Sequence, residues 1–174
     1  MTTNRSRPEA GEFMPFYASY IASVPDGDIV DVLRAGGEDI RRAAAEIPEA
    51  KGTHRYAEGK WSVKTVLGHM IDAERIFSYR VLRLARGDKT QLPGFEENDY
   101  AIAAQSDART IADLAEEMVA VRSSTVRLLA SLPDDAWLRS GSVNNGEISV
   151  RALAYIVAGH AQHHLRVLRE RYLG

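Results

Sequence analysis

The stretch Gly159-His160-Ala161-Gln162-His163-His164-Leu165 decides the fold, because it sets histidines into an otherwise apolar helical pattern. His160 and His164 are four residues apart, so their imidazoles lie on one helix face, one turn from each other. The same face continues through apolar positions on both sides, namely Val150, Leu153, Val157 and Val167. Histidine seldom fills a helix core unless each ring has a partner. The pattern therefore indicates a helix over 149–173 that turns two imidazoles toward one point, as a metal ion requires.

Two alternatives to a metal site exist: the imidazoles of His160 and His164 could bond to the backbone or to each other. Two neutral rings one turn apart would then place lone pairs face to face, which is unfavourable without a cation between them. Helical bundles also commonly hold metal ions between facing helices. We therefore favour a metal site. His163 lies about 100° around the helix, so we expect it behind the ligands or at the surface, and His54, in a loop, has no ligand role.

Three more helices are expected before this one, each with a polar cap and an apolar stripe. They are expected over 28–47, 62–86 and 110–131. A long connection over 92–100, with a short helical turn after Phe95, allows the second and third helices to run parallel. Asn144-Asn145-Gly146 predicts a turn, and with it a small hairpin. Four helices of about 20 residues without strands of consequence predict an all-α fold, a four-helix bundle.

The segments around these helices also carry signals. Residues 1–27 are expected to be an N-terminal extension, and its apolar part, Phe13 to Val24, is expected to pack across the bundle. Gly36-Gly37 interrupts the first helix at a cost of about 1 kcal/mol per glycine relative to alanine. A close crossing with a neighbouring helix would compensate for that cost.

Composition narrows the function classes. A chain of 174 residues fits a single domain spanning 1–174. Its net charge is −2 and its basic residues are spread out, so we expect no nucleic-acid partner. No apolar run approaches the roughly 18 residues that span a bilayer, and the polar start lacks a signal-peptide core, so we expect no membrane association and a cytoplasmic location. With no cysteine, any thiol chemistry needs a small-molecule thiol.

The second helix carries the other candidate residues. His69 lies in its apolar pattern, and Asp72, one turn on, could orient an imidazole or a water, or form a surface salt bridge. Arg80 returns to nearly the same face about 16 Å along the axis. It could bind an anionic end of a substrate or lie at the rim of the bundle. Glu74 and Arg75 are interpreted as solvated or interface charges.

Two motifs in this chain resemble the signatures of the DinB-like (YfiT-like) superfamily. The first is Gly59-Lys60-Trp61-Ser62 followed by Val66-Leu67-Gly68-His69-Met70-Ile71-Asp72-Ala73-Glu74-Arg75, and the second is Gly159-His160-Ala161-Gln162-His163-His164. The resemblance spans Asp28 to Leu173. It implies a four-helix bundle of up-down-down-up topology with a divalent metal held by three histidines, which by position are His69, His160 and His164.

The resemblance also implies a class of function. Members are described as metal-dependent hydrolases, and some are S-transferases that use a low-molecular-weight thiol. We therefore expect a metal-dependent S-transferase or hydrolase acting on a small-molecule substrate. Its cofactor would be Zn²⁺ or Ni²⁺, with iron or manganese as alternatives, together with a thiol cosubstrate. The rival hypotheses are a non-catalytic metal- or ligand-binding stress protein and a metal-free bundle with a partner interface. A homodimer is expected through the aromatic segment Phe13 to Tyr20.

Overall fold

Each of the four long helices begins at a polar cap that the sequence contains. The computed structural model describes residues 4–173, in which these helices are α2 (Ile29–Ala45), α3 (Val63–Ala85), α5 (Ile111–Ala130) and α6 (Val150–Val167). Their caps are Asp28, Ser62, Thr110 and Ser149, and each cap side chain accepts a hydrogen bond from a backbone N–H of the first turn. The predicted starts of all four helices are thereby confirmed.

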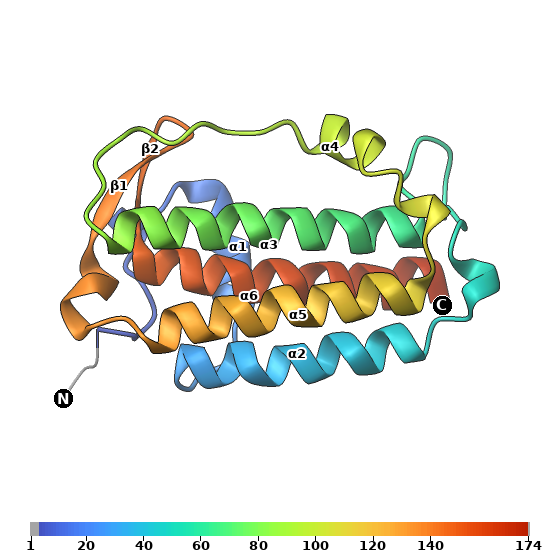
Figure 1. The fold of residues 1–174 in the computed structure, drawn as a ribbon, viewed down its shortest axis with the longest axis horizontal. Coiled ribbons are helices and arrows are strands. Elements are labelled where there is room, and N and C mark those ends of the chain that lie inside the picture. The colour runs from blue at the N-terminus through green and yellow to red at the C-terminus, as the bar shows by residue number, and fades with distance from the viewer. Residues whose placement is uncertain (1–3, 174) are drawn as a thin grey trace.

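The four helices form a bundle in which α3 and α5 run in the same direction and α2 and α6 run opposite to them (Figure 1). Helices α2 and α3 each pack against both α5 and α6. The expected up-down-down-up, all-α bundle is therefore confirmed. Because α3 and α5 are parallel, the chain must return along the whole bundle between them.

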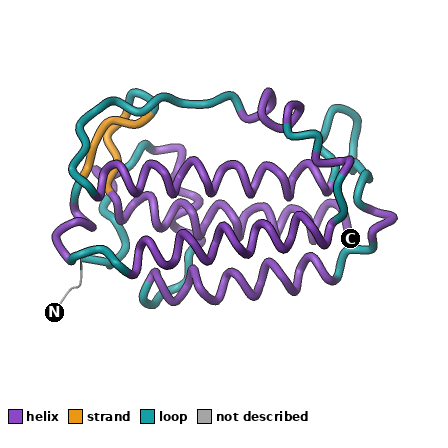
Figure 2. Tube along the Cα trace, viewed as in Figure 1, coloured by secondary structure: helices purple, strands orange, loops and turns teal. Residues whose placement is uncertain are grey.

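That return carries the short helix α4 (Glu97–Ala103), the predicted turn after Phe95 (Figure 2). The predicted hairpin is also present, as β1 (Ser140–Val143) paired antiparallel with β2 (Gly146–Ser149). Leu92 bridges to Val143, so the segment that connects α3 to α4 is fixed to the hairpin. Short 3₁₀ turns cover Ala10–Glu12, Pro15–Tyr17, Glu49–Lys51, Ser106–Ala108 and Asp134–Leu138, and Leu168–Leu173 extends α6 as a π-helical turn.

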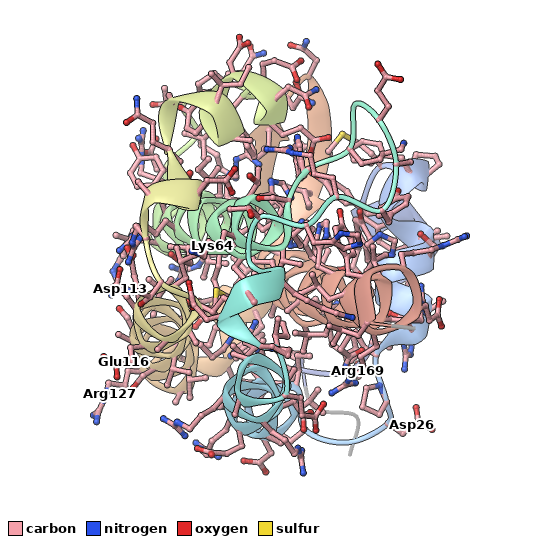
Figure 3. All side chains as sticks on the ribbon, turned by 90° about the vertical axis from the view of Figure 1, so that its right-hand side faces the viewer. Asp26, Lys64, Asp113, Glu116, Arg127 and Arg169 are labelled. Carbon is pink, nitrogen blue, oxygen red and sulfur yellow. The ribbon has the colours of Figure 1, made fainter. Side chains whose placement is uncertain are left out.

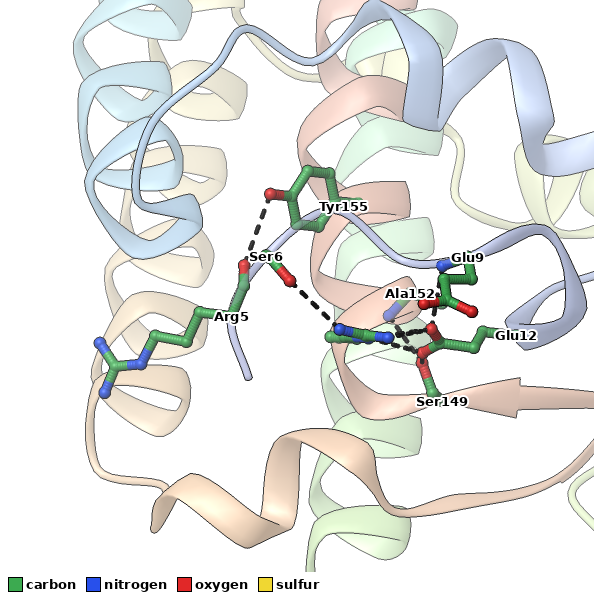
Figure 4. A network of polar contacts seen from close by, with 8 residues as sticks. Arg5, Ser6, Glu9, Glu12, Ser149, Ala152 and Tyr155 are labelled. Carbon is green, nitrogen blue, oxygen red and sulfur yellow. Dashed lines mark hydrogen bonds and ion pairs between the residues drawn. The ribbon is translucent and has the colours of Figure 1, made fainter. Parts of the chain in front are cut away.

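The N-terminal segment packs on α6 through α1 (Ala18–Ser23). A polar network holds the segment before it to the start of α6 (Figure 4). There the Ser149 hydroxyl donates to Glu12 at 2.7 Å, and the Arg151 guanidinium pairs with the same carboxylate. Phe16 stays exposed on this segment, and the expected homodimer stays a prediction.

One interpretation of the sequence was wrong. Glu74 is not solvated: its side chain and that of Arg122 on α5 are each 3% exposed and form a two-point ion pair with both N···O distances at 2.7 Å. A Cβ at Gly36 would come too close to the Arg122 guanidinium. Gly36 therefore makes room for this arginine where α2 packs against α5, which is a close crossing of the kind that the sequence suggested.

The outer surface is charged and polar. Seen along the bundle, Asp113, Glu116 and Arg127 on α5 project away from the interior (Figure 3). Arg75, as interpreted from the sequence, is exposed and pairs with Glu117. Within residues 4–173, no helix is both long and apolar enough to cross a membrane.

Candidate metal centre

Three histidines from two helices converge inside the bundle. His69 on α3 and His164 on α6 each place Nε2 at 3.1 Å from Nε2 of His160. One ligand atom from each of the three residues lies within 4.8 Å of the other two. His69 is 5% exposed and His160 is 7% exposed, whereas His164 is half-buried. The three imidazoles therefore converge as the sequence and the resemblance predicted, and their role as metal ligands stays a prediction.

The surroundings of the cluster keep all three imidazoles neutral at neutral pH. Burial lowers the pKa of His69 to about 4. Burial and the neighbouring His69 and His163 lower the pKa of His164 to about 3. The pKa of buried His160 lies well below its usual value, first through burial and then through His164 and His69. A neutral imidazole offers a lone pair, which is the form that binds a metal ion.

These residues fit a metal ion better than they fit one another. Nε2 of His160 faces two other Nε2 atoms at 3.1 Å, but it carries either one proton or one lone pair. One atom cannot make two good hydrogen bonds in that situation, because both contacts compete for the same proton or lone pair. A cation at the centre satisfies three converging lone pairs at once, and three neutral nitrogen ligands suit Zn²⁺ and other first-row transition metals.

A glycine precedes the histidine on each helix and lets other segments approach. A Cβ at Gly159 would clash with the backbone of Tyr20, so the glycine allows α1 to lie directly against α6 beside His160. A Cβ at Gly68 would clash with the buried side chain of Ser106. Trp61 adds a wall, its ring centroid 4.7 Å from that of His69. The cluster is thus enclosed by segments outside the four-helix core.

A cavity of about 550 Å³ opens on the histidine cluster. Its apolar wall is largely aromatic and comes from the 3₁₀ turn before α1, α1 itself, the loop before α3, α3, and the segment between α3 and α4. The aromatic residues are, in that order, Tyr17, Tyr20, Trp61, Phe77 and Phe95. A second hollow of about 340 Å³ shares Trp61, Glu97, His163 and His164 with it. Two spaces of small-molecule size therefore meet at the histidines.

The structure separates the remaining candidates. Arg80 lines the larger cavity, and so does half-buried His163, which the sequence placed behind the ligands or at the surface. Asp72 is not among the residues that line either hollow; it is half-buried near Arg75 and Glu117, and burial raises its pKa. Its orienting role stays a prediction. His54 is exposed outside both hollows.

Sequence reasoning missed the aromatic wall. Tyr17 and Tyr20 were assigned to packing and a dimer interface, yet both line the cavity, and the ring of Tyr20 lies 5.6 Å from that of His160. The signal that pointed to them was Gly159, because a glycine inside a core helix often marks a close approach by another segment.

The fold and the site together define a four-helix bundle protein with a three-histidine cluster of metal-ligand geometry. Residues 33–168 match the DinB superfamily, and the chain belongs to that superfamily. This confirms the resemblance drawn from the two histidine motifs.

Individual relatives agree with this assignment. A protein of Oceanobacillus iheyensis named "Putative metal-dependent hydrolase" is 28% identical over 113 residues, which are 63% of this chain and 64% of that protein. The chain thus spans somewhat less than two thirds of that relative's length. YfiT from Bacillus subtilis, described as a probable metal-dependent hydrolase with an unusual four-helix bundle topology, aligns with a TM-score of 0.73 at 18% identity over 96% of this chain and 95% of its own.

A mycothiol-dependent maleylpyruvate isomerase aligns with a TM-score of 0.67 at 13% identity, over 86% of this chain and 62% of its own. At such identities, the two structural neighbours establish the fold alone.

Proposed function

We propose that this chain is a metal-dependent enzyme that transfers a group between small molecules at the three-histidine cluster, with a soluble thiol as one reactant. The observation that carries the proposal is the position of the cluster, which lies where two hollows of small-molecule size meet. One hollow can hold each reactant, so a two-substrate reaction suits the site.

The protein's own residues would bind the metal ion and enclose the substrate. His69, His160 and His164 supply three neutral nitrogen ligands from rigid helices. A divalent cation held by them would act as a Lewis acid with open positions and lower the pKa of a bound thiol or water. The aromatic wall formed by Tyr17, Tyr20, Trp61, Phe77 and Phe95 excludes water and packs against the apolar body of a substrate.

The thiol must come from outside the chain, because the sequence contains no cysteine. In the proposed reaction, the thiol sulfur forms a bond to an electrophilic carbon, the bond from that carbon to its leaving group breaks, and the thiol proton passes to solvent. The structural neighbour named as mycothiol-dependent supports a thiol partner for this fold.

Hydrolysis is the second candidate, and the names of two relatives favour it. Water would then take the place of the thiol at the same site. A non-catalytic metal-binding protein is the alternative of another class, since ligand geometry alone does not require turnover.

Zinc- or nickel-loaded protein incubated with a thiol and monochlorobimane tests the proposal. Sulfur displaces chloride from the bimane, and fluorescence reports the product. We expect turnover above the free-metal control and a fall of at least about 100-fold in His69→Ala, because the substitution removes a ligand. His54→Ala, outside both hollows, is the matched control.

Activity unchanged in His69→Ala would contradict catalysis at this centre. Full metal occupancy of the wild type with neither thiol transfer nor hydrolysis would favour the non-catalytic alternative.

A further inference from the structure

The bundle contains two buried arginines on its long helices with opposite surroundings. Arg122 is fully paired with the carboxylate of Glu74. Arg80 is equally buried, with 4% of its surface exposed, yet within residues 4–173 it forms no ion pair with a carboxylate. A buried charge is costly unless it is paired and hydrogen-bonded. Arg80 therefore needs an explanation that Arg122 does not.

The Arg80 guanidinium contacts two oxygens of the fold, the carbonyl of Pro93 and the hydroxyl of Tyr17, and its remaining donors can serve a ligand. Its Nη2 donates to the carbonyl oxygen of Pro93 at 2.8 Å. Its Cζ lies 5.8 Å from the ring centroid of Phe77 and 5.9 Å from that of Phe95, so the charged group is within cation–π distance of two aromatic rings. A guanidinium has five N–H donors, and this one lines the 550 Å³ cavity.

The acidic residues nearest this cavity lie on its exposed rim. Glu96 and Glu97 both line it, and both are exposed at the start of α4. Glu96 already accepts a hydrogen bond from the backbone N–H of Asn98 as the helix cap. Neither carboxylate forms an ion pair with Arg80 of the kind that Glu74 forms with Arg122.

Phe77 links Arg80 to the histidine cluster. Its ring centroid is 5.7 Å from that of His160 and 5.8 Å from Cζ of Arg80. The guanidinium therefore lies no farther than about 11.5 Å from the His160 ring. A small molecule can reach both groups at once, with its apolar middle on the aromatic wall.

We propose that Arg80 is the anion subsite of this cavity and that the ligand is a small carboxylic acid. Its carboxylate binds Arg80 while its reacting atom lies at His69, His160 and His164. The position of the ligand's reacting atom rests on the proposed function, whereas binding of its carboxylate depends on Arg80 alone. The carboxylate can belong to the thiol or to the electrophile, since either one can occupy the larger cavity.

Cobalt-loaded protein tests the subsite, because the cobalt absorption spectrum reports thiol binding without turnover. The probes are 3-mercaptopropionate, 6-mercaptohexanoate and 8-mercaptooctanoate, each compared with its methyl ester. We expect at least one carboxylate to bind about tenfold or more tightly than its ester, since a charge-assisted hydrogen bond gains about that much. Arg80→Met should abolish the preference, and Arg80→Lys should retain part of it.

Arg86→Met, at the exposed C-cap of the same helix and outside the cavity, is the matched control. Cobalt stoichiometry and a melting curve show that each variant keeps its fold and its histidine site. Cobalt binding with no carboxylate preference in the wild type, or with the preference unchanged in Arg80→Met, would overturn the inference while leaving the proposed function intact.

A failure of cobalt to bind would instead contradict the proposed function. In that case, NMR titration of the metal-free protein with 4-phenylbutanoate and its amide decides the subsite. A wild-type preference for the carboxylate that Arg80→Met removes supports it, and equal binding overturns it.

A two-by-two comparison of turnover then identifies the source of the carboxylate. The thiols are 3-mercaptopropionate and 2-mercaptoethanol, and the electrophiles are iodoacetate and iodoacetamide. Arg80→Met should lower turnover only in the combinations whose thiol carries the carboxylate, or only in those whose electrophile carries it. A defect that is the same for all four combinations would indicate that Arg80 acts only on the protein structure and would overturn the inference.

Discussion

Nε2 of His69 and Nε2 of His160 lie 3.1 Å apart, although 91 positions separate the two residues in the chain. The contact joins α3 to α6 at the level where Gly159 lets α1 approach. It is the feature on which the metal predictions depend.

The histidine cluster should bind one divalent ion per chain. We expect protein purified without added nickel and then incubated with Zn²⁺ to hold about one equivalent. The affinity of His160→Ala should be at least about 100-fold lower, because only two of the three histidine ligands remain. Elemental analysis and calorimetry measure both quantities. His54→Ala should bind like the wild type, and full occupancy in His160→Ala would contradict the site.

The stability of the metal-free protein should fall as the pH is lowered from about 7 to 5. The unfolded chain protonates its histidines near the usual pKa of 6.5, whereas burial holds the pKa of His69 at about 4 and that of His164 at about 3 in the fold. Protons therefore favour the unfolded state in this range. Each such histidine contributes up to about 1.4 kcal/mol per pH unit.

Urea unfolding at several pH values measures this dependence. In His164→Leu, the free energy of unfolding should fall less steeply with decreasing pH than in the wild type, because the variant has one fewer buried imidazole. Equal slopes in the two proteins would count against a buried, neutral His164.

The ion pair between Glu74 and Arg122 should be costly to break from one side. Glu74→Leu leaves a buried arginine without its partner, and we expect a loss of about 3–5 kcal/mol in the free energy of unfolding. The double variant with Arg122→Leu should lose much less than the two single variants together, since no charge is then left alone. Chemical denaturation of all four proteins completes the cycle.

The exposed pair of Glu38 and Arg41 gives a matched comparison. Glu38→Leu should change stability little, because solvent screens such pairs. A strictly additive cycle at Glu74 and Arg122 would contradict the coupling inferred here.

Gly159→Ala should destabilise the bundle by about 1–3 kcal/mol, the usual cost of overpacking. The added methyl group meets the backbone of Tyr20, which cannot move aside as a flexible side-chain end could. Gly11→Ala, where a Cβ meets nothing within 4 Å, is the control. Thermal melts compare the two variants, and an unchanged melting temperature in Gly159→Ala would show that α1 does not lie against α6 as described.

Local signals in the sequence were sufficient to predict the helices and two of the three histidines of the site. The caps at Asp28, Ser62, Thr110 and Ser149 depend on contacts within three residues, so they can be read directly. His160 and His164 share a face by helix geometry alone. His69 became a ligand candidate only through the family resemblance, because no local pattern brings α3 to α6.

The contacts that were missed are those between distant segments. Glu74 alone gives no sign of burial, but Arg122 lies four residues after Met118, within the apolar stripe of α5, and a charge there indicates a buried partner. Tyr17 and Tyr20 reach the cavity through the placement of α1, which periodicity does not encode. The position of Arg80 in the cavity likewise depends on the segment between α3 and α4, which brings Phe95 beside it.

The division of the ligands between α3 and α6 has a consequence for biosynthesis. A nascent chain that has left the ribosome only through α5 carries one histidine of the three and cannot hold the ion in this geometry. If the cluster binds a metal ion as we predict, loading must follow synthesis of α6, and acquisition of the ion would mark a chain whose bundle has been completed.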